Sequence, residues 1–294
     1  MINQYYYLDM IRQLDIKPGS LVMVTADVTR LALIGRRKEV GFDIDHFIDC
    51  LQQCLGKGGT LVIPSFNFNL KNNDLFLPLK SLPITGALAV AALKRPEFLR
   101  TKNPLHSFLV WGEHAEALAS LNNRSSFSAD SPFAFMKQNQ AKMLLIDTSI
   151  SAAFTFVHHV EEMEKVSYRK FRKLMINVEE IDRETGRRGD WETGRREVLL
   201  YAKRPGWTMD LSGLEKLLLE KQVAKKMIIN KVPFTLVDLH AAYPVIKDDI
   251  NRNKAKNLAR FSPELYLREK AKSILAAIGI HTLADKISHD PGLL

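Results

Sequence analysis

Short apolar runs that alternate with helical segments are the feature that most constrains the fold of this 294-residue chain. Runs such as Thr60–Pro64 and Met143–Ile146 are apolar almost throughout, rather than at every second residue. A strand of that kind is buried on both faces, as in parallel sheets that carry helices above and below. We therefore predict an α/β fold with a mixed, partly parallel central sheet and helices on both faces.

The predicted elements follow one another without an obvious break. Helices are predicted over Gln4–Gln13, Phe42–Leu55, Gly86–Leu93, Glu113–Leu121 and Leu211–Leu219, with two charged helices near the end. Strands are predicted at Leu21–Val24, Thr60–Pro64, Phe108–Trp111, Met143–Ile146 and Phe234–Val237, with a hairpin of Leu174–Val178 and Val198–Ala202. We predict a loop at Ile34–Lys38. Since no linker or low-complexity tract divides the chain, we expect one domain over 1–294, in which residues 174–294 complete the fold.

Composition narrows the class of protein. No run of about eighteen apolar residues occurs, and the N-terminus lacks a basic-then-apolar signal, so we expect no membrane span. Cys50 and Cys54 are expected to be reduced thiols of a cytoplasmic protein. Neither a phosphate-binding loop, nor a dinucleotide fingerprint, nor a metalloprotease pattern is present, and we predict no metal site.

A hydroxyl, an imidazole and a carboxylate occur at intervals of three residues, in Thr155, His158 and Glu161. If this stretch opens a helix, the three side chains stack along one face and can act on one ligand. Thr155 suits the N-cap, and His158 then lies in the first turn, where the helix dipole favours a neutral imidazole. A neutral imidazole can remove a proton, and Glu161 can stabilise the charge that results. We predict a catalytic site here.

Two simpler interpretations must be weighed against this one. A helix start rich in His and Glu is more often a solvated, capped surface than a catalytic site. His106 and Ser107 precede an apolar run that predicts a strand, and their presence strengthens the functional interpretation. His106 could instead be a buried structural histidine at the strand.

Four segments, in a fixed order, carry a resemblance to a known family. They are Gly58-Gly59-Thr60-Leu61-Val62-Ile63-Pro64-Ser65, then Pro104-Leu105-His106-Ser107-Phe108, then Ser131-Pro132, and then Thr155-Phe156-Val157-His158-His159-Val160-Glu161, with Tyr168-Arg169 close behind. Their order and spacing resemble the aminoglycoside 3-N-acetyltransferase family. The resemblance extends from about Gly19 to Arg172 and is weak beyond that point.

The resemblance implies an acyl-CoA-dependent N-acyltransferase of mixed α/β fold, with acetyl-CoA as the expected co-substrate. It makes His158 the base that deprotonates an acceptor amine, Glu161 its partner and Thr155 a stabilising hydroxyl. Backbone N–H groups, or the hydroxyl of Ser107 or Thr155, could stabilise the oxyanion. We expect binding of substrate or cofactor by His106, Ser107, Thr25, Asp27, Ser65, Ser131 and Arg169.

The chain departs from the family in the segments around this core. The family's first strand commonly ends in His-Ser-Ser, whereas this chain has Thr25-Ala26-Asp27. The family often carries a Gly-x-Gly turn before the Thr-x-x-His element, whereas residues 147–154 contain no glycine. Small residues let a ligand approach the main chain closely, so we expect an altered specificity.

The formal net charge of +9 argues against one class of acceptor. Aminoglycosides are polycations, which a basic protein repels at long range, while CoA phosphates, a nucleotide-linked sugar or an acidic acyl-carrier protein would be attracted. Two Thr-Gly-Arg-Arg repeats, at 185–188 and 193–196, predict exposed hairpin turns. Nucleic-acid binding is not favoured, because no aromatic platform accompanies these arginines.

We therefore predict an acyl-CoA-dependent N-acyltransferase that acts on the amine of an amino sugar other than a polycationic aminoglycoside antibiotic. Two alternatives stay open: transfer from an acyl-carrier protein, and an inactive family descendant that serves as a binding protein. A homo-oligomer is also left open.

Overall fold

A seven-stranded sheet organises the molecule, in the order β10-β11-β6-β1-β2-β5-β4. The computed structural model describes residues 5–179 and 193–277. The centre of the sheet is parallel: β1 (Leu21–Ala26) pairs in parallel with both β2 (Thr60–Phe66) and β6 (Lys142–Ile146). Both flanks are antiparallel. On one side lie β11 (Val232–Asp238) and β10 (Ala224–Ile229), and on the other β5 (His106–Gly112) and β4 (Leu99–Arg100).

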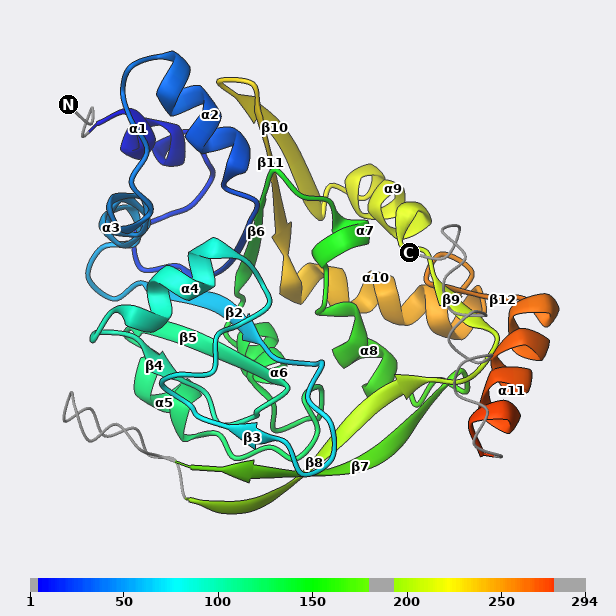
Figure 1. Cartoon of the computed structure of the whole chain (residues 1–294). Helices are drawn as coiled ribbons and strands as arrows, with labels where there is room; N and C mark the ends of the chain where they lie inside the picture. The colour runs from blue at the N-terminus through cyan, green and yellow to red at the C-terminus, as the bar shows by residue number, and fades with distance from the viewer. Residues whose placement is uncertain (1–4, 180–192, 278–294) are drawn as a thin grey trace.

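Helices cover both faces of this sheet, as the sequence predicted, and the reason is visible in β1. Its alternate residues point to opposite faces, so that Met23 and Val24 belong to different hydrophobic cores. One face packs against α1 (Tyr6–Arg12), α2 (Thr29–Arg37), α3 (Ile44–Leu55) and α4 (Ala87–Lys94). The other packs against α5 (Ala115–Ser120), α6 (Pro132–Gln138), α8 (Val157–Met163), α9 (Ser212–Glu220) and α10 (Leu239–Arg252). The predicted fold class is therefore confirmed (Figure 1).

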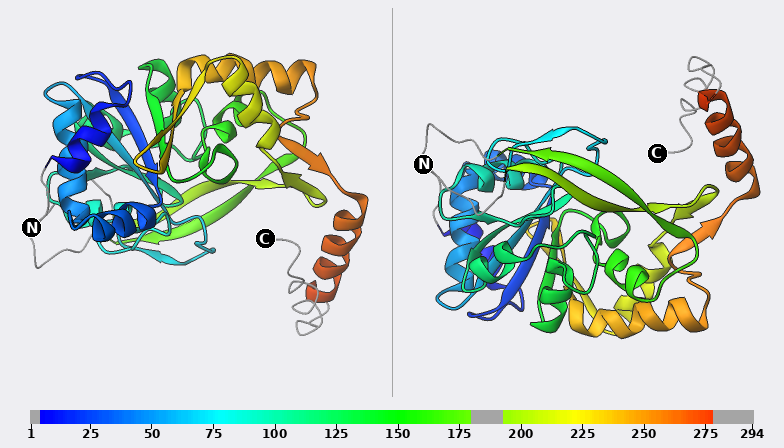
Figure 2. Two further views of the ribbon diagram at one scale, coloured as in Figure 1. Left: turned by 90° about the horizontal axis from the view of Figure 1, so that it is seen from above. Right: turned by 90° about the horizontal axis from the view of Figure 1, so that it is seen from below.

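A long hairpin, a two-stranded sheet and a C-terminal helix complete the described structure. The hairpin consists of β7 (Arg169–Val178) and β8 (Gly194–Lys203), with the short β3 (Leu75–Phe76) along its edge. Beyond it, β9 (Trp207–Met209) pairs with β12 (Ala259–Phe261), which leads into α11 (Pro263–Ala277). Figure 2 shows α11 at the far end of the molecule, next to this two-stranded sheet.

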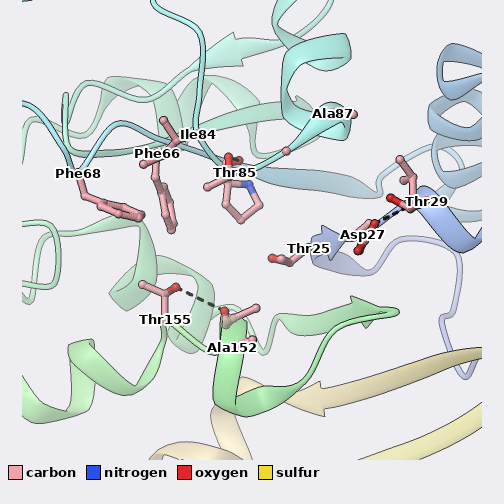
Figure 3. Close-up of a pocket in the computed structure, with 15 residues that line it drawn as sticks. Thr25, Asp27, Thr29, Phe66, Phe68, Ile84, Thr85, Ala87, Ala152 and Thr155 are labelled. Carbon is pink, nitrogen blue, oxygen red and sulfur yellow. Dashed lines mark hydrogen bonds between the residues drawn. The ribbon is translucent and has the colours of Figure 1, made fainter. Parts of the chain in front are cut away.

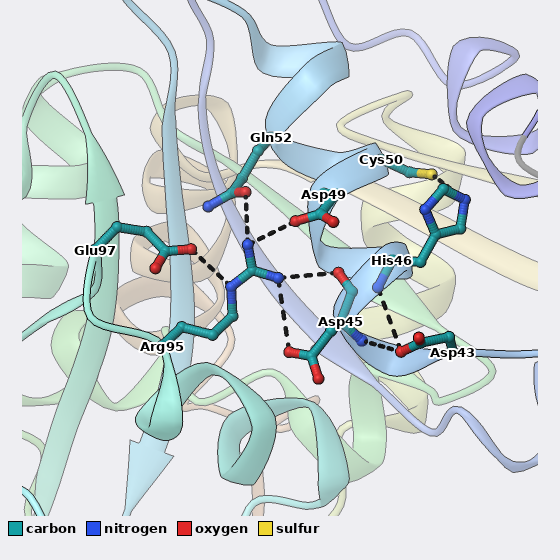
Figure 4. A network of polar contacts seen from close by, with 8 residues as sticks. All are labelled: Asp43, Asp45, His46, Asp49, Cys50, Gln52, Arg95 and Glu97. Atoms are coloured by element: carbon teal, nitrogen blue, oxygen red, sulfur yellow. Dashed lines mark hydrogen bonds and ion pairs between the residues drawn. The ribbon is translucent and has the colours of Figure 1, made fainter.

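One partly buried arginine joins the end of α4 to α3 (Figure 4). Arg95, directly after α4, lies 2.6 Å from Asp49 and 2.7 Å from Glu97, and its Nη1 donates to the carbonyl of Asp45 at 3.0 Å. Asp43 caps the start of α3 by accepting the backbone N–H of Asp45 at 2.8 Å. These contacts hold the C-terminal end of α4, the helix whose first turn borders the cavity described below.

Most predicted elements occur within a few residues of their predicted bounds, but several elements of the structure were not predicted. The predicted loop Ile34–Lys38 is wrong, because most of it belongs to α2, where Gly35 packs so closely that an added Cβ would lie 2.4 Å from the carbonyl oxygen of Gly41. Strand β10 was not predicted, since two lysines interrupt its apolar pattern, and α6 was not predicted either. Arg187 and Arg188 lie outside the described residues, while Arg195 and Arg196 belong to β8. Cys50 and Cys54 are free, as predicted, and burial raises the pKa of Cys50 to about 11.

Candidate active site

Helix α8 brings a histidine and a glutamate together near its start. His158 is its second residue, and Nδ1 of His158 lies 2.7 Å from Oε2 of Glu161, three residues further along the same face. The His158 side chain is 23% exposed and that of Glu161 is fully buried. A carboxylate on Nδ1 fixes the tautomer, so Nε2 carries the free lone pair. We call this pair the dyad.

The buried carboxylate of Glu161 is surrounded by groups that stabilise its charge. The phenol of Tyr168 donates to Oε1 at 2.7 Å, and Nε of Arg169 lies 2.6 Å from Oε2, as an ion pair rather than a well-directed hydrogen bond. The hydroxyl of Tyr201, on β8, donates to the backbone carbonyl of Glu161 at 3.0 Å. Burial alone would raise the pKa of Glu161, but the charge and hydrogen bond of His158, together with Arg169 and Tyr168, lower it on balance.

Arg169 also approaches the histidine, with Nη2 2.9 Å from Nδ1 of His158. A guanidinium only donates, and a ring nitrogen that donates to Glu161 has no lone pair left, so this approach is not a second hydrogen bond. It places positive charge beside the ring. Burial, Arg169 and Lys203 therefore lower the pKa of His158, against the opposing effect of Glu161. The ring is kept neutral, which is the state in which it can accept a proton.

A cavity of about 510 Å³ opens one helical turn before the dyad, between the ends of β1 and β2 and the first turn of α4 (Figure 3). Phe66 and Phe68 line one side, and Thr155 and Ala152 lie across from them. Its other lining residues include Thr25, Asp27, Thr85 and Gly86. The hydroxyl oxygen of Thr25 is buried and has no hydrogen-bond partner in the described chain. His158 and Glu161 do not themselves line the cavity. Apolar walls with a few hydroxyls are typical of a site for a small molecule.

Comparison with known proteins identifies the protein family. The model of the aminoglycoside 3-N-acetyltransferase family matches residues 23–249. The chain belongs to this family. The resemblance predicted from the four sequence segments is thereby confirmed.

Several solved structures share the fold. The aminoglycoside acetyltransferase AAC(3)-IVa, as apoenzyme, is 21% identical, with a TM-score of 0.67 over 90% of this chain and 93% of that one. The binary complex of AAC-IIIb with CoASH is 20% identical, with a TM-score of 0.67 over 85% of this chain and 96% of that one. The YokD protein from Bacillus subtilis is 16% identical, with a TM-score of 0.68 over 86% of this chain and all of that one.

Several predicted site residues of this family member lie at the cavity and others do not. Thr25, Asp27 and Thr155 line it. Thr155 is not the N-cap of α8, because Phe156 occupies that position and the Thr155 hydroxyl points to the carbonyl of Ala153 at 3.4 Å. The Asp27 carboxylate accepts the backbone N–H of Thr29 at 2.9 Å and so caps the start of α2.

The predicted binding serines are all internal. Ser107 is fully buried, donates to the carbonyl of Ser65 at 2.7 Å and accepts from Arg100 at 2.9 Å. Ser65 is itself fully buried, and Ser131 is the buried N-cap of α6. All three side chains are buried, and none of them lines the cavity; their binding role stays a prediction.

His106 and Arg169 are buried as well, and neither lines the cavity. His106 is buried behind the cavity wall, with Nδ1 2.8 Å from Ser126 and its ring stacked on Phe68. Burial lowers the pKa of His106 to about 3, so it stays neutral. Arg169 is buried against Glu161 and the carbonyl of Tyr201, where it supports the dyad.

The sequence analysis missed Phe66, Phe68, Tyr168 and Tyr201. One signal was available: Ser65 and Phe66 are neighbours on β2 and point to opposite faces, so only one of them could line the cavity. Within the described residues there is no cluster of side chains suited to a metal ion and no helix long and apolar enough to cross a membrane.

Proposed function

We propose that this protein is an acyl-CoA-dependent N-acyltransferase in which His158 acts as the general base. The observation that carries the proposal is the dyad, a ring held neutral by burial and oriented by a buried carboxylate, one turn away from a cavity. The chain belongs to the aminoglycoside 3-N-acetyltransferase family, and the related AAC-IIIb was solved with CoASH. Both observations support CoA as the carrier of the acyl group. Acetyl-CoA is the expected donor.

The dyad accounts for the proton transfer that amine acylation requires. Nε2 of His158 accepts a proton from the acceptor amine as nitrogen attacks the thioester carbonyl, and Glu161 stabilises the imidazolium. The C–N bond forms, the C–S bond breaks, and the proton passes from His158 to the departing thiolate. A general base of this kind contributes roughly a hundred- to ten-thousand-fold in rate.

Two cavity hydroxyls are suited to the oxyanion that forms during attack. Thr155 lies three residues before His158 in the cavity wall, and the Thr25 hydroxyl has no partner in the described chain. Ser107, the other hydroxyl considered, is buried and occupied. We therefore assign oxyanion stabilisation to Thr155 or Thr25.

The acceptor that fits best is an amino sugar of low positive charge. Among the described residues that line the cavity, Asp27 is the single acidic side chain, and it already accepts a backbone N–H. Related enzymes have been solved with apramycin and with sisomicin, but this lining and the net charge of +9 offer little to a polycation. A phosphate-bearing acceptor, such as a nucleotide-linked amino sugar, matches the charge.

The decisive experiment is to incubate the protein with acetyl-CoA and a panel of amino sugars, free and nucleotide-linked, while following the release of free thiol. We expect thiol release that depends on an amino sugar and yields an N-acetylated product by mass spectrometry. His158→Ala is the matched negative control. Thiol release without N-acetylation, or equal release by His158→Ala, would contradict the proposal.

A further inference from the structure

Four aromatic side chains form a continuous row from the dyad to the C-terminal helix. The ring of Tyr168 stacks on Trp207 at a centroid distance of 5.0 Å, Trp207 contacts Phe261 at 5.4 Å, and Phe261 contacts Tyr266 of α11 at 6.0 Å. Tyr168 is also the residue that donates to Oε1 of Glu161. The row therefore joins the catalytic carboxylate to β12 and α11, which we call the C-terminal arm.

The far end of the row is tightly packed. At Gly206, next to Trp207, an added Cβ would lie 2.6 Å from the ring of Phe261 and 2.7 Å from Cβ of Tyr266. The backbone N–H of Gly206 donates to Glu269 of α11 at 2.6 Å. Strand β9 thus has little freedom to move away from the C-terminal arm, and Trp207 is held where it meets Tyr168.

The phenol of Tyr168 is one of three groups that hold the Glu161 carboxylate. His158 and Arg169 both lie against Oε2, at 2.7 and 2.6 Å, and Tyr168 holds Oε1. If the phenol were released, the carboxylate could turn both oxygens toward the guanidinium, which favours bidentate pairing. Its contact with Nδ1 of His158 would then weaken.

We propose that Trp207 is a positioning residue for the general base: by fixing Tyr168 it fixes Glu161, so that the C-terminal arm sets the orientation of the dyad. This inference rests on the proposed role of His158. Phe261 and Tyr266 follow residue 249, the last residue matched by the family model, so this support comes from a part of the chain that the family pattern does not describe.

The direct test is the pKa of the His158 ring, measured by NMR titration of protein labelled with ¹³C in histidine. The His158 signal is assigned by its loss in His158→Ala. Other charged or titratable groups around the ring are unchanged in the test variants; they are Glu161, Arg169, Lys203 and His106. Since Glu161 raises the pKa of His158 and the other effects lower it, a looser carboxylate makes the pKa fall.

We expect the pKa of His158 to fall in Tyr168→Phe and in Trp207→Leu, and to fall no further in the double variant. Residues that act through one another are not additive, whereas independent ones are. Trp111→Leu is the matched control, a half-buried tryptophan that packs against the core on the opposite face of the sheet. Phe261→Leu, at a half-exposed position, gives the same test with less risk to folding.

The inference is overturned if Trp207→Leu and Phe261→Leu leave the His158 pKa unchanged, if the double variant is additive, or if Trp111→Leu causes the same shift. With acetyl-CoA and the amino sugar turned over fastest, kcat should fall on the order of tenfold, because displacements of about 1 Å are costly in catalysis. KM should change little, since no residue of the row lines the cavity. If His158→Ala stays active, the proposed function is wrong, yet the NMR titration still decides whether Trp207 positions Glu161.

Discussion

Two adjacent glutamates of helix α8 have pKa values that are shifted in opposite directions. Toward the β7–β8 hairpin, Glu161 is fully buried, yet Arg169, His158 and Tyr168 lower its pKa. Toward the loop before α6, burial and the charge of Asp130 raise the pKa of Glu162 from 4.5 to about 7, against the hydrogen bond that it accepts from Ser125. Both carboxylates are desolvated, so the charges and hydrogen-bond donors around each one decide the direction of its pKa shift. Arg169 lies on the Glu161 side, where it also approaches His158.

The largest effect is expected for His158→Ala. Loss of a general base should reduce kcat roughly a hundred- to ten-thousand-fold. The free energy of unfolding should change little, because the ring is partly exposed. Steady-state assays of thiol release and urea denaturation measure the two quantities, with His240→Ala, at an exposed position on another helix, as control. A variant that keeps more than about a tenth of the activity would remove His158 from this role.

Arg169→Met should shift the pKa of Glu161 in the same direction as that of Glu162. Removing one partner of a buried ion pair costs about 3–5 kcal/mol in general, because an uncompensated charge remains. The pKa of Glu161 should then rise, as that of Glu162 does. The stability lost relative to wild type should therefore be greatest at neutral pH and shrink as pH falls and Glu161 takes up a proton. Urea denaturation across pH 5–8 tests this; a loss independent of pH would contradict it.

Glu161→Gln and Glu162→Gln form a matched pair. Removing the charge of Glu161 removes an influence that raises the pKa of His158, so the apparent pKa of the kcat/KM profile should fall while the maximal rate drops about tenfold or more. Glu162→Gln should leave the profile in place. An unchanged profile in Glu161→Gln would separate that residue from His158.

Glu162 itself should affect stability, with a sign opposite to that of Glu161. Its folded pKa of about 7 lies above its ordinary value of 4.5, so the folded protein binds more protons between these values. Stability contributed by the protonated form is therefore present at low pH and is lost as pH rises through about 7. Glu162→Gln should flatten this decline in the free energy of unfolding. A decline of equal slope in the variant would assign it to another group.

The smallest effects concern the exposed charges, which salt should screen while leaving the buried dyad unaffected. Binding of CoA, or of a nucleotide-linked sugar, should weaken as salt rises, since exposed charges are screened beyond about 10 Å at 0.1 M ionic strength. Kanamycin-like polycations should bind poorly. Isothermal titration at two salt concentrations measures both. Tight aminoglycoside binding would overturn the assignment of the acceptor, and salt-independent CoA binding would show that local contacts outweigh net charge.

The local sequence pattern predicted most of the strands of the central sheet and the helical face that carries His158 and Glu161. Buried strands such as β2 and β6 are apolar throughout, and the period of the chain places His158 and Glu161 on one helical face whatever surrounds them. The local sequence pattern could not show which side chains line the cavity. Ser65, Ser107 and Ser131 were chosen by their place in family segments, and only the packed structure shows that their hydroxyls face inward.

The sequence by itself determined the fold class, the family and the pair of residues at the centre of the site, because these depend on periodicity and on the spacing of a few side chains. Tertiary structure decided the rest. Tyr168, Arg169 and Tyr201 reach Glu161 only because the hairpin folds back over α8, and Trp207 reaches Tyr168 only because β9 pairs with β12. Such contacts join residues far apart in the chain, and the charge state of a buried group depends on all of them at once.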